Sequence, residues 1–327
     1  MNVLVLNCGS SSLKFQLIDT DLARAAEGTD RLLAKGIVED IGGTGILKLE
    51  ASGRPAVRES AEVLEHKIAV EKVVDWLCRP GVGILGSPRD IHAVGHRIVH
   101  GGERFKSSVR MDDAVLRGIE DCFEMAPLHN PPNVNGCSVA AIRGGKSVDT
   151  SMGFTPLEGL MMGSRSGDLD PAIVLHVMRK EELGPWEMDA LLNKHSGLIG
   201  LSGISNDMRA LLDAEREGNA RARVAVEVFS HRLKKYIGAY IGVLGGIDGI
   251  AFAGGIGENA PAIRRRALEG LEALGLSLDR RANDDARGKE AEISPSGARV
   301  RAFVVPTNEE ILIARDTLHL VSGRSPS

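Results

Sequence analysis

A short polar turn near the start of the chain carries residues suited to binding phosphate. An apolar run ends at Asn7, and a cysteine, a glycine and three serines follow it. Small residues after a glycine allow backbone N–H groups and serine hydroxyls to surround phosphate oxygens, and Lys14 adds a positive charge. The Asn7 side chain offers an oxygen ligand for Mg²⁺. We interpret this turn as a phosphate loop that includes Ser10 and Ser12, with an ordinary polar hairpin turn as the alternative.

An arginine in a second strand-like segment is a candidate anion ligand. Arg97 precedes two glycines, Gly101 and Gly102. A guanidinium at such a strand end suits bidentate binding of a carboxylate or a phosphate, although a structural ion pair explains it nearly as well. His96 and His100 flank the arginine at the spacing of a helical metal pair, but the segment is strand-like and has no third ligand nearby. We therefore do not predict a metal site there.

Further candidates lie in constrained or polar segments. His129 stands in a proline-rich loop that restricts its motion, and a structural role and a functional role explain it equally well. Arg165 lies in segment 152–171, which has little periodicity and many constrained residues. Glu309 opens the last predicted helix, where the helix dipole favours a carboxylate even without a function. The polar segment 206–209 completes the set.

A glycine-rich segment, 255–260, fits the pattern Gly-x-Gly-x-x-Ala between a strand and a helix. The pattern occurs in dinucleotide-binding sites, but too little chain follows it to build such a nucleotide-binding half, so an NAD-dependent oxidoreductase is a distant alternative. We predict a glycine turn that opens a helix and can hold a nucleotide, with Asn259 at the helix cap and Pro261 in the first turn. Residues 144–147 imitate a P-loop but lack its first glycine.

The elements that must position these residues alternate between strands and helices, which predicts an α/β fold. The polar stretch 283–298 is predicted to be a solvated loop. Asn135-Gly136-Cys137-Ser138 echoes the turn after Asn7, which suggests two halves of similar topology. The hydrophobic patterns predict strands at 2–7, 13–18, 91–99, 248–253 and 301–306, hairpins at 42–58 and 135–152, and helices at 59–78, 221–244, 260–274 and after 307.

Composition limits the class of partner. The 327 residues suffice for about two domains, and 40 basic against 44 acidic side chains leave a net charge of −4. This balance removes the electrostatic reason to expect nucleic acid or an anionic membrane as the main partner. The four cysteines are far apart, and no apolar run reaches the roughly 18 residues of a membrane span. We predict a cytoplasmic enzyme or binding protein with reduced thiols.

Taken together, these segments resemble the acetate kinase family, whose members form acyl phosphates. The resemblance covers nearly the whole chain. It implies a fold of two duplicated ribonuclease-H-like domains of the sugar kinase, Hsp70 and actin superfamily, at 1–133 plus 312–327 and at 134–311. It also implies a cytoplasmic homodimer that interconverts ATP and acetate with ADP and acetyl phosphate. The motifs that carry it are NCGSSSLKF, HRIVHGGERF, APLHNPPN, VDTSMGFTPLEGLMMGSRSGDLDP, GISNDMR, FAGGIGEN and PTNEE.

The resemblance also implies a role for each candidate. Asn7 and Glu309 would position Mg²⁺ or Mn²⁺. Arg97 and Arg165 would bind the substrate carboxylate and the transferring phosphoryl group, with His129 beside them as a third catalytic residue. Two arginines and a metal ion are the expected means of neutralising a phosphoryl group in transfer. The implied nucleotide site comprises Lys14, Asn135, Gly136, Asp207, Met208, Arg209, Gly255, Ile256, Gly257, Glu258 and Asn259.

One departure from the family is large. Between the APLHNP motif and Asn135, the family has a long segment with a catalytic aspartate in Phe-Asp-Thr and a transition-state histidine in Gly-x-His-Gly-Thr-Ser-His, and neither motif occurs here. On the order of 80 residues are absent near Val134, judged from the family's length. Their loss would remove much of the first strand of the second domain and leave apolar edges exposed.

Two hypotheses follow from this departure. Either a segment of a normal kinase is missing from this sequence, which we favour because every other motif is intact, or the chain is a true deletion and a catalytically inactive nucleotide-binding relative. Propionate kinase is a further alternative, because one methylene in an acyl pocket is worth only about 1–3 kcal/mol of discrimination.

Overall fold

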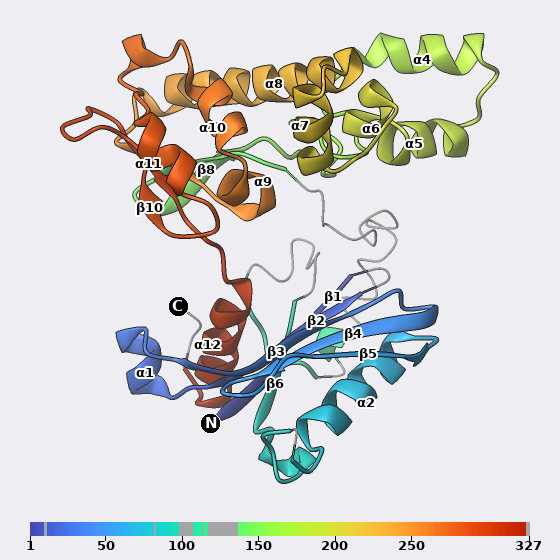
Figure 1. The fold of residues 1–327 in the computed structure, drawn as a ribbon, viewed down its shortest axis with the longest axis vertical. Coiled ribbons are helices and arrows are strands. Elements are labelled where there is room, and N and C mark those ends of the chain that lie inside the picture. The colour runs from blue at the N-terminus through green and yellow to red at the C-terminus, as the bar shows by residue number, and fades with distance from the viewer. Residues whose placement is uncertain (10–11, 82, 98–106, 113, 117–136, 325–327) are drawn as a thin grey trace. The chain divides into compact units, whose positions relative to one another are not determined.

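The structure, a computed structural model, describes residues 1–9, 12–81, 83–97, 107–112, 114–116 and 137–324. The chain divides into two compact units, which are drawn in Figure 1. Unit 1 consists of Met1–Asn133 together with Asn308–Ser327, and unit 2 consists of Val134–Thr307.

The described strands of unit 1 form one mixed sheet in the order β5-β4-β3-β2-β1-β6. β1 is antiparallel to β2 and parallel to β6, so it is paired on both sides. The remaining strands continue the sheet as an antiparallel meander. The bounds are β1 (Asn2–Cys8), β2 (Leu13–Asp19), β3 (Arg31–Glu39), β4 (Gly43–Ala51), β5 (Val57–Val63) and β6 (Ala93–His96).

Two helices cover the two faces of this sheet, and β1 is buried against both. Leu4 and Leu6 belong to the core that contains α2 (His66–Leu77), whereas Val3 and Val5 pack with α12 (Glu309–Val321). This alternation follows from the two-residue period of a strand. Unit 1 also contains α1 (Leu22–Glu27) and a short 3₁₀ helix (Pro88–Asp90).

The described strands of unit 2 form two separate sheets rather than one. β7 and β8 make a hairpin, and β9 runs parallel to β11, which is antiparallel to the short β10. Within the described residues, β7 and β9 are each paired on one side only. The bounds are β7 (Ala140–Arg143), β8 (Lys146–Thr150), β9 (Gly249–Phe252), β10 (Ala291–Glu292) and β11 (Arg301–Val304).

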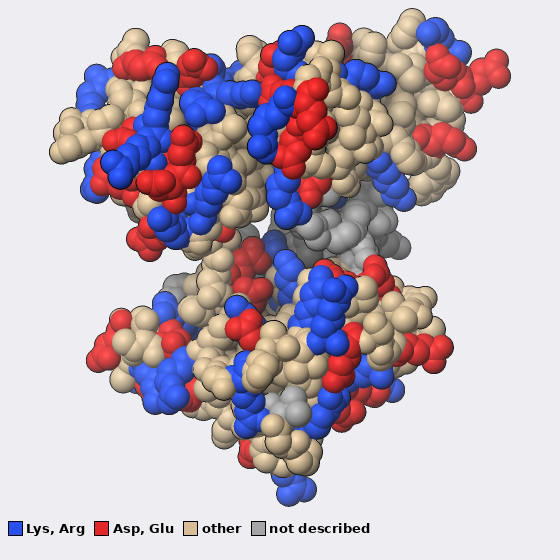
Figure 2. All heavy atoms as spheres, viewed as in Figure 1, with Lys and Arg blue, Asp and Glu red and all other residues tan. Residues whose placement is uncertain are grey.

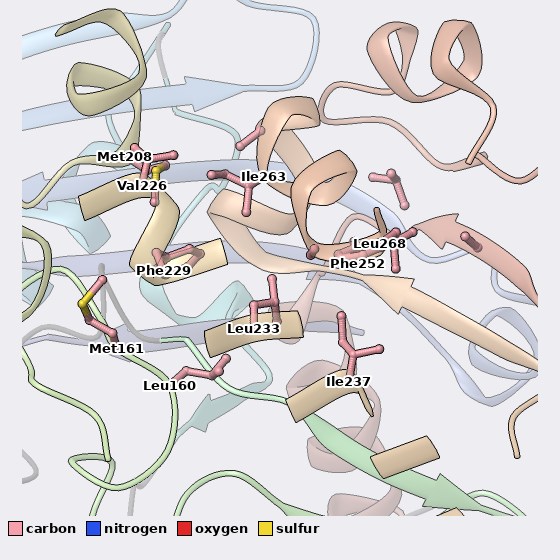
Figure 3. Close-up of a cluster of buried hydrophobic side chains, with 14 of the residues drawn as sticks. Leu160, Met161, Met208, Val226, Phe229, Leu233, Ile237, Phe252, Ile263 and Leu268 are labelled. Carbon is pink, nitrogen blue, oxygen red and sulfur yellow. The ribbon is translucent and has the colours of Figure 1, made fainter. Parts of the chain in front are cut away.

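A long helix, α8 (Ala220–Leu244), organises the core of unit 2. Its buried side chains recur every three or four residues, which is the apolar stripe of an amphipathic helix. Figure 3 shows Phe229, Leu233 and Ile237 of this helix within one cluster that also contains Phe252 of β9. The other helices are α4 (Pro171–Lys180), α5 (Pro185–Lys194), α6 (Gly197–Ser202), α7 (Met208–Arg216), α9 (Gly254–Asn259), α10 (Pro261–Leu268), a short 3₁₀ helix (Glu272–Leu274) and α11 (Arg280–Asp285).

The structure corrects three predictions about local structure. The helix predicted at 59–78 begins only at His66, because Val57–Val63 has a two-residue polar and apolar alternation and forms the edge strand β5. The segment 283–298, predicted to be a solvated loop, includes the end of α11 and strand β10, and Asn283 and Ile293 are fully buried. Asn259 is the last residue of α9 and does not cap α10, although Pro261 does stand in the first turn of α10 as predicted.

The surface agrees with the balanced composition. On the face of each unit that Figure 2 shows, basic and acidic side chains are interspersed, and the net charge of the whole chain is −4. Among the helices that the structure describes, none combines the length and the apolar character needed to cross a membrane.

Candidate active site

Four of the predicted site residues lie at the same end of the central strands of unit 1. Asn7 and Lys14 are opposite each other near the turn of the β1–β2 hairpin, and Ser12 lies in that turn just before β2. β6 runs parallel to β1 and ends one residue before Arg97, so Arg97 follows at this same end. The sheet therefore gathers an amide, an ammonium, a hydroxyl and a guanidinium from three neighbouring strands.

Glu309 joins this group through a contact with Arg97. Nη1 of Arg97 donates to Oε2 of Glu309 at 3.0 Å and to Oε1 at 3.4 Å. Glu309 is the first residue of α12, as predicted, and the Asn308 side chain caps the helix by accepting from Ile311 N. The two side chains are 40% and 51% exposed. An ion pair this exposed contributes about 0–1 kcal/mol, so either partner can exchange the other for a ligand at little cost.

Two histidines support the turn that carries the serines. Nε2 of His66 lies 2.7 Å from the carbonyl oxygen of Gly9, and Gly9 N donates to Ser12 O at 2.7 Å. Nε2 of His96 lies 3.3 Å from Sγ of Cys8, at the end of β1. Burial lowers the pKa of His96, which favours the neutral imidazole. Sequence reasoning missed His66, because nothing local marks a residue that acts through a contact 57 positions away.

In unit 2, Arg165 is held in a well-packed loop. The Leu198 N–H of α6 donates to Met162 O at 3.0 Å, and Met162 N donates to Arg165 O at 3.1 Å. The Arg165 side chain is buried, with Nη1 3.7 Å from Sδ of Met162. Burial lowers the pKa of Arg165, and no described carboxylate forms an ion pair with it. A desolvated guanidinium without a carboxylate partner attracts an anionic ligand.

The same loop contains an aspartate whose oxygens are fully engaged. Oδ1 of Asp168 accepts from Gly159 N at 2.7 Å, and Oδ2 accepts from the Tyr236 hydroxyl at 2.7 Å and from Arg232 at 3.3 Å. Burial, together with the hydrogen bond to Asp168, raises the pKa of Tyr236. Asp168 therefore ties the Arg165 loop to α8. The sequence alone could not identify the partners of Asp168 on α8, which lie more than 60 residues away.

The segment 207–209 begins helix α7. Asp207 caps the helix by accepting from Arg209 N at 2.8 Å, and it also accepts from the Arg209 guanidinium at 2.6 Å. This contact lowers the pKa of Asp207. Arg209 is highly exposed, whereas the Met208 side chain is buried in the core. Of the three residues, Met208 can reach a ligand only through its backbone.

The segment 255–259 forms a short helix, α9, directly after β9. Oε1 of Glu258 accepts from Gly254 N at 2.9 Å and from Thr307 N at 3.0 Å, which ties the start of α9 to the end of unit 2. Asn259 Nδ2 donates to Gly255 O at 3.1 Å. Gly254 has a φ of +70°, a conformation that a residue with a side chain rarely adopts.

A fully buried arginine, Arg264, fixes α9 by donating to two of its carbonyl oxygens. Its Nη1 donates to Gly257 O at 2.7 Å and to Glu258 O at 3.0 Å, and its other nitrogens donate to both oxygens of Asn283 and to Ala286 O. Burial, with a smaller contribution from Arg287, lowers the pKa of Arg264 to about 10. The sequence offered no signal for this role, because Arg264 stands in a run of three arginines that is typical of a solvated helix face.

Several predicted site residues lie outside the part of the chain that the structure describes. These are Ser10, His129, Asn135 and Gly136. The described candidates form two groups, one in each unit. Unit 1 contributes Asn7, Ser12, Lys14, Arg97 and Glu309, and unit 2 contributes Arg165, Asp207, Met208, Arg209, Gly255, Ile256, Gly257, Glu258 and Asn259.

Solved structures share this fold. The crystal structure of Porphyromonas gingivalis acetate kinase matches with a TM-score of 0.88 at 34% identity, over 98% of this chain and 99% of that chain. The crystal structure of a propionate kinase from Francisella tularensis matches with a TM-score of 0.86 at 30% identity, over 98% of this chain and 100% of that chain. The chain therefore has the actin-like ATPase fold of the sugar kinase superfamily, as its sequence predicted.

Sequence comparison narrows this class to one family. The profile of the Acetokinase family matches residues 2–137 and 134–315. The acetate kinase of Solibacter usitatus is 42% identical over 409 aligned positions, which cover 99% of each chain, and that of Desulfitobacterium hafniense is 41% identical over 407 positions. The chain belongs to the Acetokinase family. The predictions of an acetate kinase and of a phosphotransferase are thereby confirmed.

The same comparisons locate the missing segment. The alignment with the Solibacter usitatus protein spans 409 positions, whereas this chain has 327 residues, so on the order of 80 aligned positions have no residue of this chain opposite them. The family profile matches in two pieces that meet at residues 134–137. The gap therefore lies where the sequence analysis placed it, at the start of unit 2.

Proposed function

We propose that this acetate kinase transfers the γ-phosphoryl group of ATP to acetate in a Mg²⁺-dependent, reversible reaction that gives acetyl phosphate and ADP. The observation that carries the proposal is the gathering of Asn7, Lys14, Arg97 and Glu309 at one end of the unit 1 sheet. A phosphoryl group in transfer needs several positive donors around its equatorial oxygens, and a metal ion needs hard oxygen ligands nearby.

The residues of this group fit a magnesium ion. The Asn7 amide oxygen and the Glu309 carboxylate are the hard oxygen donors that Mg²⁺ prefers, and Mg²⁺ takes its remaining ligands from water and phosphate. We propose that these two residues hold the ion, which neutralises phosphate charge when bound. Lys14, Ser10 and Ser12 would contact phosphate oxygens. Mn²⁺ would fit the same ligands.

Two arginines are proposed to supply positive charge. We propose that Arg97 binds the acetate carboxylate and that Arg165 contacts the transferring phosphoryl group, with His129 beside them. The buried, unpaired guanidinium of Arg165 supports this role, because charge stabilisation is strongest where water is excluded. The nucleotide would lie against Asn135, Gly136, Asp207, Met208, Arg209 and the segment 255–259.

The reaction needs no general base. Acetate is ionised at pH 7, as a carboxylic acid of ordinary pKa is. One carboxylate oxygen forms a bond to the γ-phosphorus, and the bond between that phosphorus and the bridging oxygen of ADP breaks, with the electron pair leaving on ADP. No proton changes place, so the work of these residues is to position the reactants and to neutralise charge.

We further propose a cytoplasmic homodimer whose two domains are 1–133 plus 312–327 and 134–311. The net charge of −4 and the interspersed surface charges support a small-molecule enzyme without a nucleic-acid partner. Propionate is the second candidate acceptor, and the match to a propionate kinase structure favours testing it. One methylene changes kcat/KM by about 10–200-fold at most.

A hydroxamate assay with ATP, Mg²⁺ and either acetate or propionate tests the proposal. We expect acyl-hydroxamate with acetate, and Arg165→Ala should lower kcat by about 10²–10³-fold, the loss typical of removing one charge-stabilising donor. Arg179→Ala, an exposed arginine on α4, is the matched control and should change nothing. Acyl-hydroxamate formation that survives Arg165→Ala unchanged would contradict the role of this residue.

A second measurement separates an active chain from an inactive relative. Nucleotide binding by calorimetry without any turnover would identify an inactive relative. In that case, the aligned segment of the Solibacter usitatus protein should be inserted between Asn133 and Val134. Turnover in the insertion variant would show that this chain lacks only this segment for activity. No turnover in the insertion variant would contradict the proposed roles of the other residues.

A further inference from the structure

Two unpaired strand edges in unit 2 border one cavity. β7 is paired only with β8, and β9 is paired only with β11, within the described residues. Every residue of both strands lines a cavity of about 750 Å³. Unpaired N–H and C=O groups along a strand edge are a template for another strand.

The floor of this cavity is apolar. Phe229, Leu233, Ile237 and Tyr240 of α8 line it, and all four are largely buried. Figure 3 shows Leu233 and Ile237 pointing into the cluster that β9 also enters. At the rim, Ile142 of β7 is 61% exposed. A cavity with two polar strand edges and an apolar floor suits an extended peptide, which presents main-chain groups sideways and side chains downwards.

Unit 1 shows what fills the corresponding place. There, β1 lies between β2 and β6, antiparallel to the first and parallel to the second. The turn after Asn7 joins β1 to β2. In unit 2, the echoing segment 135–138 stands just before β7, so the strand that should precede it would lie between β7 and β9.

The sequence before β7 does not have the pattern of a strand. Residues 127–134 read Pro-Leu-His-Asn-Pro-Pro-Asn-Val. Proline has no N–H to donate and is excluded from the interior of a sheet. The segment of about 80 positions that the relatives have at this point is absent from this chain. The cavity is therefore the place of a strand that the chain itself does not encode.

We propose that the groove between β7 and β9 binds an extended apolar strand from another polypeptide, antiparallel to β7 and parallel to β9. The occupant would be about four to seven residues long, since β7 and β9 have four residues each and β1 has seven. Its main chain would join the two sheets of unit 2 into one, and alternate side chains would contact α8. The inference rests on the fold and not on enzymatic activity.

A labelled peptide that copies the strand of unit 1, Asn-Val-Leu-Val-Leu-Asn between lysine pairs, is the probe. Its binding to the full chain is followed by fluorescence anisotropy, and hydrogen exchange is followed at β7 and β9. The control peptide has the same side chains but carries N-methyl groups on alternate residues, which remove the donors. We expect protection of the amides of both strands and at least tenfold weaker binding of the control peptide.

Two chain variants test the place of binding. Ile142→Asp puts a charge on the wall of the groove, whereas Val148→Asp puts the same charge on β8, outside the cavity, at a residue that is 47% exposed. We expect at least tenfold weaker peptide binding for Ile142→Asp and less than a twofold change for Val148→Asp. Equal binding of the two peptides, an equal effect of the two variants, or no binding and no change in exchange at millimolar peptide would overturn the proposal.

Discussion

In unit 1, strand β1 is paired on both sides, and Val3 and Val5 are fully buried. In unit 2, among the residues that the structure describes, β7 and β9 have no strand paired to the edges that border the corresponding place. Unit 1 is held together by a continuous sheet between α2 and α12. Unit 2 relies on the long helix α8, whose stripe of buried side chains contacts β9 and α10. In unit 2, a core built on a helix therefore holds β9 and α9 in place without a central strand.

The two units also stabilise a buried charge in opposite ways. In unit 1, Asp30 is buried and accepts from Arg315 at 2.6 and 2.8 Å and from the Thr20 hydroxyl. In unit 2, the buried Arg264 has no carboxylate partner among the residues that the structure describes and donates to carbonyl oxygens instead. The first unit pairs opposite charges, and the second spreads one charge over several dipoles.

The largest expected effect concerns Arg264. Arg264→Met leaves three acceptors, Gly257 O, Asn283 Oδ1 and Ala286 O, without a donor among the described contacts, and each costs about 1–3 kcal/mol. We expect unit 2 to lose about 4 kcal/mol or more of unfolding free energy, while unit 1 keeps its own, as measured by native-state hydrogen exchange of amides in each unit. Arg265→Met, at the more exposed neighbouring position, is the control and should change stability by less than about 0.5 kcal/mol. A loss below about 1 kcal/mol of unfolding free energy for Arg264→Met would contradict the stabilising role of Arg264.

Next in size is a pair of leucine truncations that compares the two cores. Leu17 of β2 is completely buried, whereas Leu233 of α8 borders the cavity. A leucine beside a cavity has lost contacts on one side already. We expect Leu17→Ala to cost about 4 kcal/mol and Leu233→Ala about 2 kcal/mol, measured by the same exchange experiment. Equal losses would mean that the cavity is filled in solution.

The smallest effect is the contribution of Asp30 to the pH dependence of unit 1. Although burial opposes its ionisation, the hydrogen bonds from Thr20 and Arg315 hold the pKa of Asp30 below its ordinary value. A carboxyl with a depressed folded pKa stabilises the protein fully above its unfolded pKa of about 3.9, and this stability is lost as the pH falls through the folded pKa. We expect acid unfolding of unit 1 to begin near pH 4 and Asp30→Asn to flatten it, at a cost of about 2 kcal/mol at pH 7.

Asp75→Asn is the control for this measurement, because Asp75 is an exposed residue of α2. It should leave the acid unfolding of unit 1 unchanged. If Asp30→Asn also leaves the pH dependence of unfolding unchanged, the contact between Asp30 and Arg315 is not its cause.

Sequence periodicity predicted the elements whose packing follows a simple repeat. The strand after Met1, the helix 221–244 and the strand before Arg97 are of this kind, because one face or both faces of each are buried over its length. Strand β5 was missed as an edge strand because its charged residues, Arg58, Glu59 and Glu62, have spacings of three and four residues that also fit a helix. Arg264 could not be predicted to be buried, because it stands in a run of three arginines at 264–266 and only its tertiary contacts distinguish it from the other two.

The candidate site divides in the same way. Residue types and the family resemblance predicted Arg97 and Glu309, but they could not show that these residues contact each other across 212 positions of sequence. That contact depends on α12 returning to unit 1. The contacts of Asp168 and Glu258 also join distant segments, so the sequence indicated their positions and not their partners.

The return of α12 to unit 1 has a consequence for the order of events during synthesis. Val3, Val5 and Ile18 pack against Ala314 of this helix, which is translated long after the six strands of unit 1. At about 5–20 residues per second, the ribosome needs roughly 10–40 s to make the chain between Asn133 and α12. Throughout that interval, one apolar face of the sheet of unit 1 is exposed to solvent. The nascent chain must therefore be kept from associating with other chains through this face. The strands of unit 1 are translated before unit 2, and a helix translated after unit 2 completes unit 1.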